Sequence, residues 1–382
     1  MKSKIWLSSP HMGGQELKYI HEAFDTNWVA PLGPNVNGFE EDLESFLGEG
    51  VQVAALSAGT AALHMGLINL GVEAGDEVIC QTMTFSASAN PIAYLGAKPV
   101  FVDSETDTWN MCPIALEEAI KARTIATGKK PKAIVPVHLY GMPAKMDEIM
   151  AVAKKYEVPV LEDAAEGLGS TYKGRQCGTF GELAALSFNG NKIITTSGGG
   201  ALVSQTKEHK EHTVFLSTQA RDNAPHYQHS HIGYNYRMSN IVAGIGRGQM
   251  EVLNDRIAAR RANNQFYQEL FKDIAGVTVF VEPTSDFFSN HWLSCITIDE
   301  AVAGKNREQL RLALLEENIE TRPLWKPMHM QPIFENAPYY GGQVAEHLFD
   351  CGLCLPSGSN LTEEERERIA VAVKAFFAFG SN

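Results

Sequence analysis

The first half of the chain alternates short apolar runs with helical patterns of hydrophobic residues. The apolar runs are continuous rather than interrupted by polar residues, which is typical of strands buried on both faces. The predicted strands cover residues 77–80, 99–102, 133–138, 158–161, 184–188 and 200–203. Helical patterns lie between them at residues 61–69, 87–95, 113–121 and 146–156. Repeated strand–helix–strand units predict an α/β fold with a mostly parallel sheet, and such sheets bind ligands beyond the carboxyl ends of their strands.

A different pattern begins near Ser239. A long helical pattern rich in Arg, Asn and Gln covers residues 241–267 and is suited to bridging two domains. After it come strand patterns at 277–281 and 293–298 and helical patterns at 307–317 and 363–377. We therefore predict a large domain of residues 1–245 and a smaller C-terminal α+β domain of residues 246–382.

Composition and charge narrow the class of protein. The 382 residues are 44% hydrophobic and 20% charged, which is typical of a soluble globular protein. The net charge of −13 argues against a nucleic-acid partner, because phosphate backbones repel an acidic surface. The N-terminal residues lack the apolar stretch of a signal peptide, and no apolar run reaches the roughly 18 residues of a membrane span.

The six cysteines are scattered along the chain. Cys351 and Cys354 have the spacing of a metal-binding pair, but no second pair completes a site, so no metal is expected. Reduced, mostly buried thiols are favoured over a metal or redox function. This favours the cytoplasm as the compartment.

Lys192 and Asp163 are the main candidates for chemistry. Lys192 enters a turn rich in Thr, Ser and Gly after an apolar strand, and Asp163 is one of the carboxylates that end the apolar strand 158–161. A lysine that forms a Schiff base and an acid that pairs with the ring nitrogen are what pyridoxal phosphate requires from a protein. The alternative is a solvated turn lysine and a helix-capping aspartate.

Further segments fit the same cofactor. Gly59 and Thr60 open a helix after a short strand, where free amides bind phosphate, and Ser187 adds a second hydroxyl. Phe85 follows a strand and can stack on a flat ring. The segment 233–240 is crowded with hydrogen-bond donors, as a phosphate or carboxylate site would be. A capped helix, a core phenylalanine and a polar turn are the respective alternatives.

Together these segments resemble the sugar-nucleotide aminotransferases of the DegT/DnrJ/StrS type, which are pyridoxal-phosphate enzymes of the aspartate-aminotransferase fold (fold type I). The resemblance covers nearly the whole chain. It rests on residues 31–34, 39–40, 57–63, 162–166, 187–192, 234–239, 320–329 and 355–357. No Gly-x-Gly-x-x-Gly joins a strand to a helix, which disfavours an NAD-dependent sugar oxidoreductase.

Within that family, the chain is most similar to the C-4 aminotransferases of UDP-N-acetylbacillosamine biosynthesis. The similarity lies in residues 10–14, 30–33, 189–200 and 217–221. Many relatives carry an acid between the glycines where this chain has Gly198, a departure that bears on the substrate subgroup. Deoxygenating relatives replace the Schiff-base lysine with histidine, so Lys192 favours amino transfer over dehydration.

The resemblance implies a role for each candidate residue. Lys192 would form the Schiff base, and Asp163 would pair with the ring nitrogen. Glu166 would lie by the ring oxygen and Phe85 would stack on the ring. The phosphate would be held by Gly59, Thr60 and Ser187, with Asn235 reaching in from the second subunit of a homodimer. Arg237 could bind the glutamate carboxylate, and Lys326 or His329 the nucleotide-sugar.

The expected activity is transfer of an amino group from L-glutamate to C-4 of a UDP-4-keto-6-deoxy-N-acetylhexosamine, in the synthesis of a surface glycan or glycoprotein sugar. A dTDP- or GDP-linked 4-keto sugar and a 3-keto sugar remain alternatives. A pyridoxal-phosphate-binding regulator without turnover is the alternative from a different class.

Overall fold

The computed structural model describes residues 2–378. At the centre of the large domain lie two four-stranded sheets. One sheet has the order β1 (Gln52–Leu56), β9 (Gly200–Ser204), β8 (Leu183–Ser187) and β5 (Leu161–Asp163). The other has the order β14 (Tyr339–Tyr340), β3 (Lys98–Val102), β2 (Glu77–Gln81) and β4 (Ala133–Val135). Parallel bridges from Ile134 to Val160 and from Val137 to Asp163 connect β4 with β5. The two sheets therefore continue one another across the middle of the large domain.

The prediction of a mostly parallel sheet is confirmed, with one exception. β9 runs antiparallel to both of its neighbours, β8 and β1. Only the loop 188–199 joins β8 to β9, and a parallel pair would have needed a longer crossover connection. That loop contains Lys192, so the antiparallel strand places the lysine at the carboxyl end of β8.

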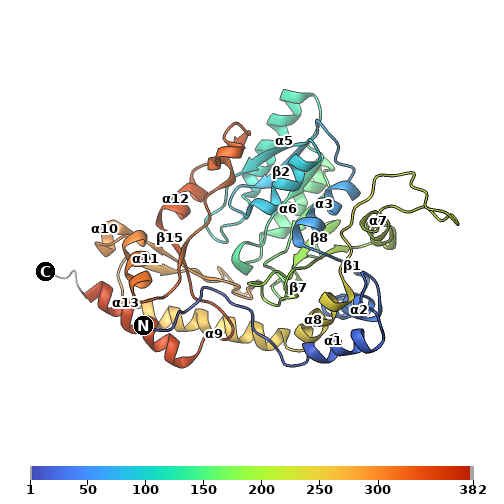
Figure 1. Ribbon diagram of the computed structural model, residues 1–382. Helices are drawn as coiled ribbons and strands as arrows, with labels where there is room; N and C mark the ends of the chain where they lie inside the picture. The colour runs from blue at the N-terminus through green and yellow to red at the C-terminus, as the bar shows by residue number, and fades with distance from the viewer. Residues whose placement is uncertain (1, 379–382) are drawn as a thin grey trace.

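Helices cover both faces of this sheet, as its continuous apolar strands require (Figure 1). On β2, Val78 and Cys80 pack in the core that includes α3 (Gly59–Asn69), while Ile79 packs on the opposite face. The opposite face is covered by α5 (Pro113–Thr127), α6 (Met146–Tyr156) and α2 (Pro34–Leu47). α7 (Lys207–Ser217) lies beside α3.

Several predicted boundaries differ from the structure. The strand predicted at 133–138 ends at Val135, and the strand predicted at 158–161 is β5, which ends two residues later at Asp163. The helix predicted at 87–95 is divided into a 3-10 turn, η1 (Ser86–Ser88), and α4 (Asn90–Tyr94). Pro91 explains the division, because a proline is tolerated in the first turn of a helix but not in its interior.

The smaller domain packs helices around the sheet β10–β12–β15–β13. Its strands are β10 (Val277–Val279), β12 (Ser294–Ile298), β15 (Gly352–Leu355) and β13 (Arg322–Pro323). Its helices are α10 (Glu300–Ala303), α11 (Arg307–Glu316), α12 (Val344–Cys351) and α13 (Glu363–Ala378). Neither domain is one continuous stretch of sequence. Ile5, near the N-terminus, packs in the core of the smaller domain, and β14, in the C-terminal part of the chain, pairs with β3 of the large sheet.

The single long helix expected at 241–267 was wrong. The chain forms α8 (Asn240–Met250) and α9 (Leu253–Phe271), and Val252 between them is not helical. α8 packs closely on α1 (Glu16–Asp25) and α2, since a Cβ on Gly248 would lie 2.7 Å from the backbone of Glu16. The predicted boundary at 245/246 therefore falls inside a helix of the large domain. α9 alone runs on to the smaller domain (Figure 1).

A buried arginine on α9 ties both domains to the loop that carries the catalytic lysine candidate. Arg260 is 1% exposed and donates hydrogen bonds to the backbone oxygens of Trp292 (2.5 Å), Ser357 (3.3 Å) and Lys192 (3.3 Å). It also donates to Ser8 Oγ at 3.0 Å. Within residues 2–378 it forms no salt bridge, and burial lowers the pKa of its guanidinium. The backbone oxygens thus solvate this cation where an acid would otherwise be needed.

We expect Arg260→Met to lower the free energy of unfolding of the apoprotein by about 3 kcal/mol or more, because buried carbonyl oxygens lose their donor. Urea denaturation followed by tryptophan fluorescence measures the change. The matched control is Arg311→Met, whose guanidinium is paired with Glu308 on the surface of α11 and should change stability by about 0.5 kcal/mol or less. Equal losses in the two variants would contradict this role of Arg260.

Candidate active site

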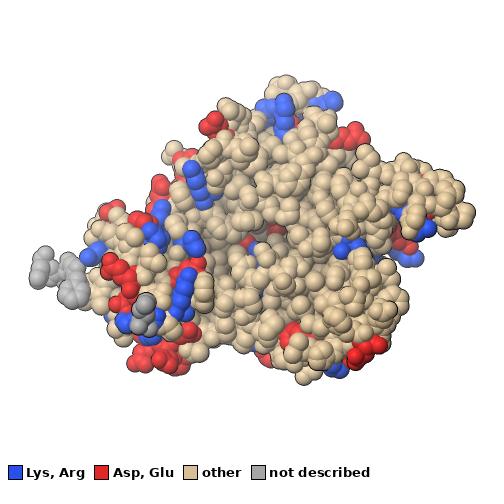
Figure 2. All heavy atoms as spheres, viewed as in Figure 1, with Lys and Arg blue, Asp and Glu red and all other residues tan. Residues whose placement is uncertain are grey.

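One cavity of about 600 Å³ collects most of the predicted site residues. It lies at the carboxyl ends of β5 and β8 and is closed on the other side by residues of the smaller domain. Figure 2 shows the corresponding hollow between the two parts of the molecule, with charged atoms on its floor. The predicted residues on its lining are Gly59, Thr60, Phe85, Asp163, Glu166, Ser187 and Lys192.

Lys192 and Glu166 form an ion pair on the floor of this cavity. Lys192 Nζ lies 3.0 Å from Glu166 Oε1, and the two side chains are 11% and 3% exposed. The ring of Trp292 lies against the ammonium group, with Nζ 4.1 Å from the ring centroid. The lysine amine is therefore held in a largely dry site, where its hydrogen bond and charge interaction are stronger than in water.

Burial decides the proton affinity of Glu166. It raises the pKa of this carboxyl to about 7, although the charge of Lys192 and the backbone N–H of Tyr140 oppose the shift. The carboxyl can therefore gain or lose a proton near neutral pH. A group of this kind beside a reactive amine can serve proton transfer.

Asp163 lies at the last position of β5 and is 4% exposed. Its Oδ1 accepts a hydrogen bond from the N–H of Ala165, and its Oδ2 accepts one from the hydroxyl of Ser88. The strand end thus directs a carboxylate into the same cavity as Lys192, as the sequence predicted from the neighbouring strand ends.

The N-terminus of α3 forms an anion cradle on the cavity wall. Its N-cap residue, Ala58, has no side chain that could satisfy the first amides of the helix, so these amides remain available for an anion. Gly59 lies so close to Ser187 that a Cβ there would be 2.8 Å from Ser187 Cβ. Thr60 adds a hydroxyl to the same wall. The cradle, the lysine and the acid fit the phosphate, aldehyde and ring nitrogen of pyridoxal phosphate.

An aromatic wall faces this cradle, and sequence reasoning missed most of it. Tyr140 and Trp292 pack against Trp325, with ring centroids 5.1 and 6.2 Å from it, and Phe85 lies 5.7 Å from Trp325. Phe85 is 58% exposed, so it is not a core residue. Tyr140 lies in the 3-10 turn η2 (Leu139–Gly141) and Trp292 and Trp325 lie in loops, and the sequence assigned none of the three to the site. Only their convergence in space identifies them as a wall that excludes water.

Three of the expected substrate contacts do not reach the cavity in this protomer. Arg237 pairs with Glu40 at 2.5 Å and donates to the backbone oxygen of Ala55, so its guanidinium is already used in a structural ion pair. Its role toward the glutamate carboxylate therefore stays a prediction from the sequence.

His329 and Lys326 do not line the cavity. His329 is 2.6 Å from Thr82 Oγ1 and 3.1 Å from Glu346, and it stacks on Tyr339 with centroids 3.9 Å apart. These contacts use both ring nitrogens and one ring face. Lys326 is also absent from the cavity lining. Neither side chain is therefore placed to contact a sugar nucleotide in this protomer.

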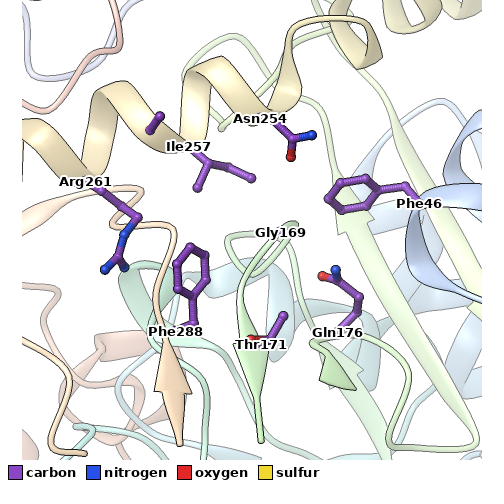
Figure 3. A pocket seen from close by; sticks show the side chains of 9 residues that line it. Phe46, Gly169, Thr171, Gln176, Asn254, Ile257, Arg261 and Phe288 are labelled. Atoms are coloured by element: carbon purple, nitrogen blue, oxygen red, sulfur yellow. The ribbon is translucent and has the colours of Figure 1, made fainter. Parts of the chain in front are cut away.

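A second cavity, of about 650 Å³, lies between α9 and the small sheet of β6 (Thr171–Tyr172), β7 (Arg175–Gln176) and β11 (Phe287–Phe288) (Figure 3). The charged residue on its lining is Arg261. Its guanidinium forms a salt bridge with Glu282 and stacks on the ring of Phe288. None of the predicted site residues lines it. The chemistry therefore belongs to the cavity around Lys192.

The sheet order, the lysine loop and the anion cradle define a pyridoxal-phosphate enzyme of fold type I. Comparison with known proteins gives the particular family. The DegT/DnrJ/EryC1/StrS aminotransferase family matches residues 10–374, and the chain belongs to this family.

Three similar proteins illustrate the relationship. EpsN of Bacillus subtilis (strain 168), which carries the provisional name of a pyridoxal phosphate-dependent aminotransferase, is 53% identical over 97% of this chain and 95% of its own length. A GDP-perosamine synthase of Escherichia coli O157:H7 is 38% identical over 97% of both chains. A solved DegT DnrJ EryC1 StrS aminotransferase from Brucella abortus is 30% identical and has a TM-score of 0.86 over 95% of both chains. The protein is thus a sugar-nucleotide aminotransferase that uses pyridoxal phosphate.

Two further expectations can be compared with the described residues. No group of three His, Cys, Asp or Glu side chains in residues 2–378 could hold a metal ion, and all six cysteines are free thiols. Across the same residues, no helix has the length and apolar character of a membrane span. The cytoplasmic location and the lack of a nucleic-acid partner stay predictions from the sequence.

We expect Gly59→Ala to weaken pyridoxal phosphate binding roughly tenfold or more, because the new methyl group displaces Ser187 and disturbs hydrogen bonds to a charged phosphate. Titrating the apoprotein with the cofactor, followed by tryptophan fluorescence, gives the dissociation constant. Gly198→Ala is the matched control: Gly198 lines the same cavity, but a Cβ there meets nothing within 4 Å. If both variants bind the cofactor as the parent protein does, the cradle lies elsewhere.

Proposed function

We propose that the protein transfers an amino group from L-glutamate to C-4 of a UDP-4-keto-6-deoxy-N-acetylhexosamine. The observation that carries amino transfer is the Lys192 amine, held 3.0 Å from Glu166 in one cavity with Asp163 and an uncapped helix N-terminus. The choice of substrate is supported by the similarity of residues 189–200 and 217–221 to the UDP-N-acetylbacillosamine subgroup. The product would be an amino sugar for a surface glycan or glycoprotein.

A GDP-linked 4-keto-6-deoxy sugar is the second candidate. It is favoured by relatives named GDP-perosamine synthase, at 38% and 35% identity over 97% of this chain. A dTDP-linked sugar has weaker support: DesI, solved in the presence of its TDP-sugar product, is 26% identical to this chain and has a TM-score of 0.87. A 3-keto sugar is an alternative from the sequence resemblance alone. A regulator without turnover is disfavoured, because the lysine, the acid and the cradle are all in place.

Bound pyridoxal phosphate supplies an electron sink and carries the amino group between the two substrates. The chain's own residues supply the rest. The N-terminal amides of α3, with Ser187 and Thr60, bind the phosphate and fix the position of the ring. Asp163 would hold a proton at the ring nitrogen. Lys192 would hold the cofactor through its amine and move the proton at the reacting carbon.

Glu166 and the aromatic wall control the surroundings of that amine. Glu166 accepts hydrogen bonds from Lys192 and from the N–H of Tyr140, so it can hold a proton while the lysine is engaged. Trp292 and Trp325 exclude water from the reacting carbon and offer flat apolar faces to a sugar ring.

We expect Lys192→Ala to reduce turnover by roughly 10²–10⁴-fold or more at saturating cofactor, because the amine proposed to move the proton at the reacting carbon is removed. The measurement is formation of 2-oxoglutarate with a 4-keto sugar nucleotide as acceptor. Lys207→Ala, on the exposed surface of α7, should retain parental activity. A fully active Lys192→Ala enzyme would refute the mechanism.

The same assay decides the substrate. UDP-, dTDP- and GDP-linked 4-keto-6-deoxy sugars, each with and without the 2-acetamido group, are compared by kcat/KM. The proposal requires the UDP-linked N-acetyl sugar to be preferred, by roughly tenfold or more for contacts made through hydrogen bonds. Preference for the GDP-linked sugar would select the second candidate.

We also propose a homodimer in which the cavity is completed by Asn235 of the second copy. The segment after α7 projects from the body of the protomer (Figure 1), and Thr218 and Asn235 pair at its base. Asn235 does not line the cavity of its own protomer. Tyr227 and Ile232 on this segment are 81% and 85% exposed, and the face around the hollow carries few charged residues (Figure 2). Such apolar exposure is typical of a surface that another chain covers.

Mixing two inactive variants tests the shared site. Lys192→Ala lacks the amine, and Asn235→Asp sets a negative charge against the phosphate. Refolded or subunit-exchanged mixtures should regain up to about a quarter of parental activity, because half the dimers are mixed and each has one intact site. Activity no higher than that of the separate variants would place Asn235 outside the shared site.

A further inference from the structure

Two buried hydroxyl groups connect Asp163 to the wall that carries Phe85. Ser88 Oγ donates to Asp163 Oδ2 at 2.5 Å, and Thr84 Oγ1 lies 2.5 Å from Ser88 Oγ. Thr84 and Ser88 are both 1% exposed, and Thr84 lines the cavity. Neither residue belongs to the set of contacts expected from the sequence.

The direction of this chain of hydrogen bonds follows from the number of protons. An ionised carboxylate can only accept hydrogen bonds, so the hydroxyl of Ser88 donates its single proton to Asp163. Ser88 Oγ must then accept from Thr84, whose proton is the only one left between them. The chain therefore runs Thr84 → Ser88 → Asp163 and ends on the negative charge, and hydrogen bonds in such a series polarise one another.

The hydroxyl of Ser88 is not used by its own helical turn. A serine in a helix often bonds a carbonyl oxygen one turn earlier, which competes with other partners. Here the hydroxyl bonds instead to a residue 75 positions away in the sequence. Its bond to the carboxylate is also shorter than the one from the N–H of Ala165, which is 3.2 Å. Short hydrogen bonds to an ionised oxygen are the stronger ones.

The surroundings of Asp163 make this support necessary. Burial disfavours a charged carboxylate, and Glu166 brings a second acid into the same cavity, where the charge of Asp163 helps to raise the pKa of Glu166. A buried carboxylate therefore requires hydrogen-bond donors that compensate its charge. Ser88 is the side-chain donor on Oδ2.

We propose that Thr84 and Ser88 are positioning residues that hold the carboxylate of Asp163 aimed at the ring nitrogen of pyridoxal phosphate. The inference rests on the role proposed above for Asp163. The turn 84–88 also carries Phe85, so the two hydroxyls fix the ring-stacking side chain and the acid relative to each other. The strength of the pairing at the ring nitrogen is then set by residues that need not touch the ring.

The test uses protein loaded with pyridoxal phosphate that is labelled with ¹⁵N at the ring nitrogen. The nitrogen chemical shift reports directly whether that atom carries a proton, which a general loss of packing would not change. Ser88→Ala and Thr84→Val remove the two hydroxyls, and Thr84→Ser restores one of them without the methyl group. Ser86→Ala is the control, since Ser86 lies in the same 3-10 turn but has no side-chain bond to Asp163. Urea unfolding of each apoprotein shows that the fold is retained.

We expect the chemical shift to move toward that of the unprotonated nitrogen in Ser88→Ala, with a smaller movement in Thr84→Val. The cofactor dissociation constant should rise, and the maximal rate of the glutamate half-reaction should fall, each by roughly tenfold for a lost bond to a charged group. The KM for glutamate should stay unchanged. Thr84→Ser and Ser86→Ala should match the parent protein.

The inference would be overturned if Ser88→Ala and Ser86→Ala had the same nitrogen chemical shift, cofactor affinity and half-reaction rate. Asp163→Asn separates this failure from a failure of the proposed function. If Asp163→Asn changes the chemical shift and Ser88→Ala does not, the acid acts without the hydroxyls. If neither changes it, the role of Asp163 itself is refuted, and with it the basis of the inference.

Discussion

The guanidinium of Arg260 is the interaction on which the geometry of the site depends. It is buried without an acid partner and is solvated by backbone oxygens of Lys192, Trp292 and Ser357. Those oxygens belong to the lysine loop of the large domain and to two segments of the smaller domain. Moving any of them would leave a charge without compensation in a low-dielectric interior, so the cation fixes all of them together. The lysine loop is thereby positioned through its backbone, while the amine of Lys192 points to the cavity and pairs with Glu166.

The charges in the cavity follow from the same low dielectric. Lys192 and Glu166 stay paired because water cannot replace either partner, and Asp163 accepts a hydrogen bond from the buried hydroxyl of Ser88. Each acid has its own kind of donor: an ammonium and a backbone N–H for Glu166, a hydroxyl and a backbone N–H for Asp163. Two carboxyls in one cavity can therefore differ in proton affinity, which is what separate roles in proton transfer require.

Local sequence signals located residues that line the cavity. Lys192 and Asp163 follow apolar strands and Gly59 opens a helix, so the residues beside each of them mark it as a strand-end or helix-end position. Contacts between residues that are distant in the sequence leave no such signal. The ion pair of Arg237 with Glu40 and the buried position of Arg260 are two examples. The long helix at 241–267 was overextended, because nothing in its composition marks the point where it leaves α1 and α2 for the smaller domain.

The sequence by itself determined the class of fold, the chemistry and the family, because continuous apolar strands, strand-end polar residues and ordered motifs are properties of short segments. Tertiary structure alone decided which side chains share the cavity. It brought Trp292 and Trp325 against Lys192, removed His329 and Lys326 from the lining, and joined Ser88 to Asp163. The reason is physical: a hydrogen bond or ring contact depends on distance in space, and periodicity encodes only which face of an element is buried.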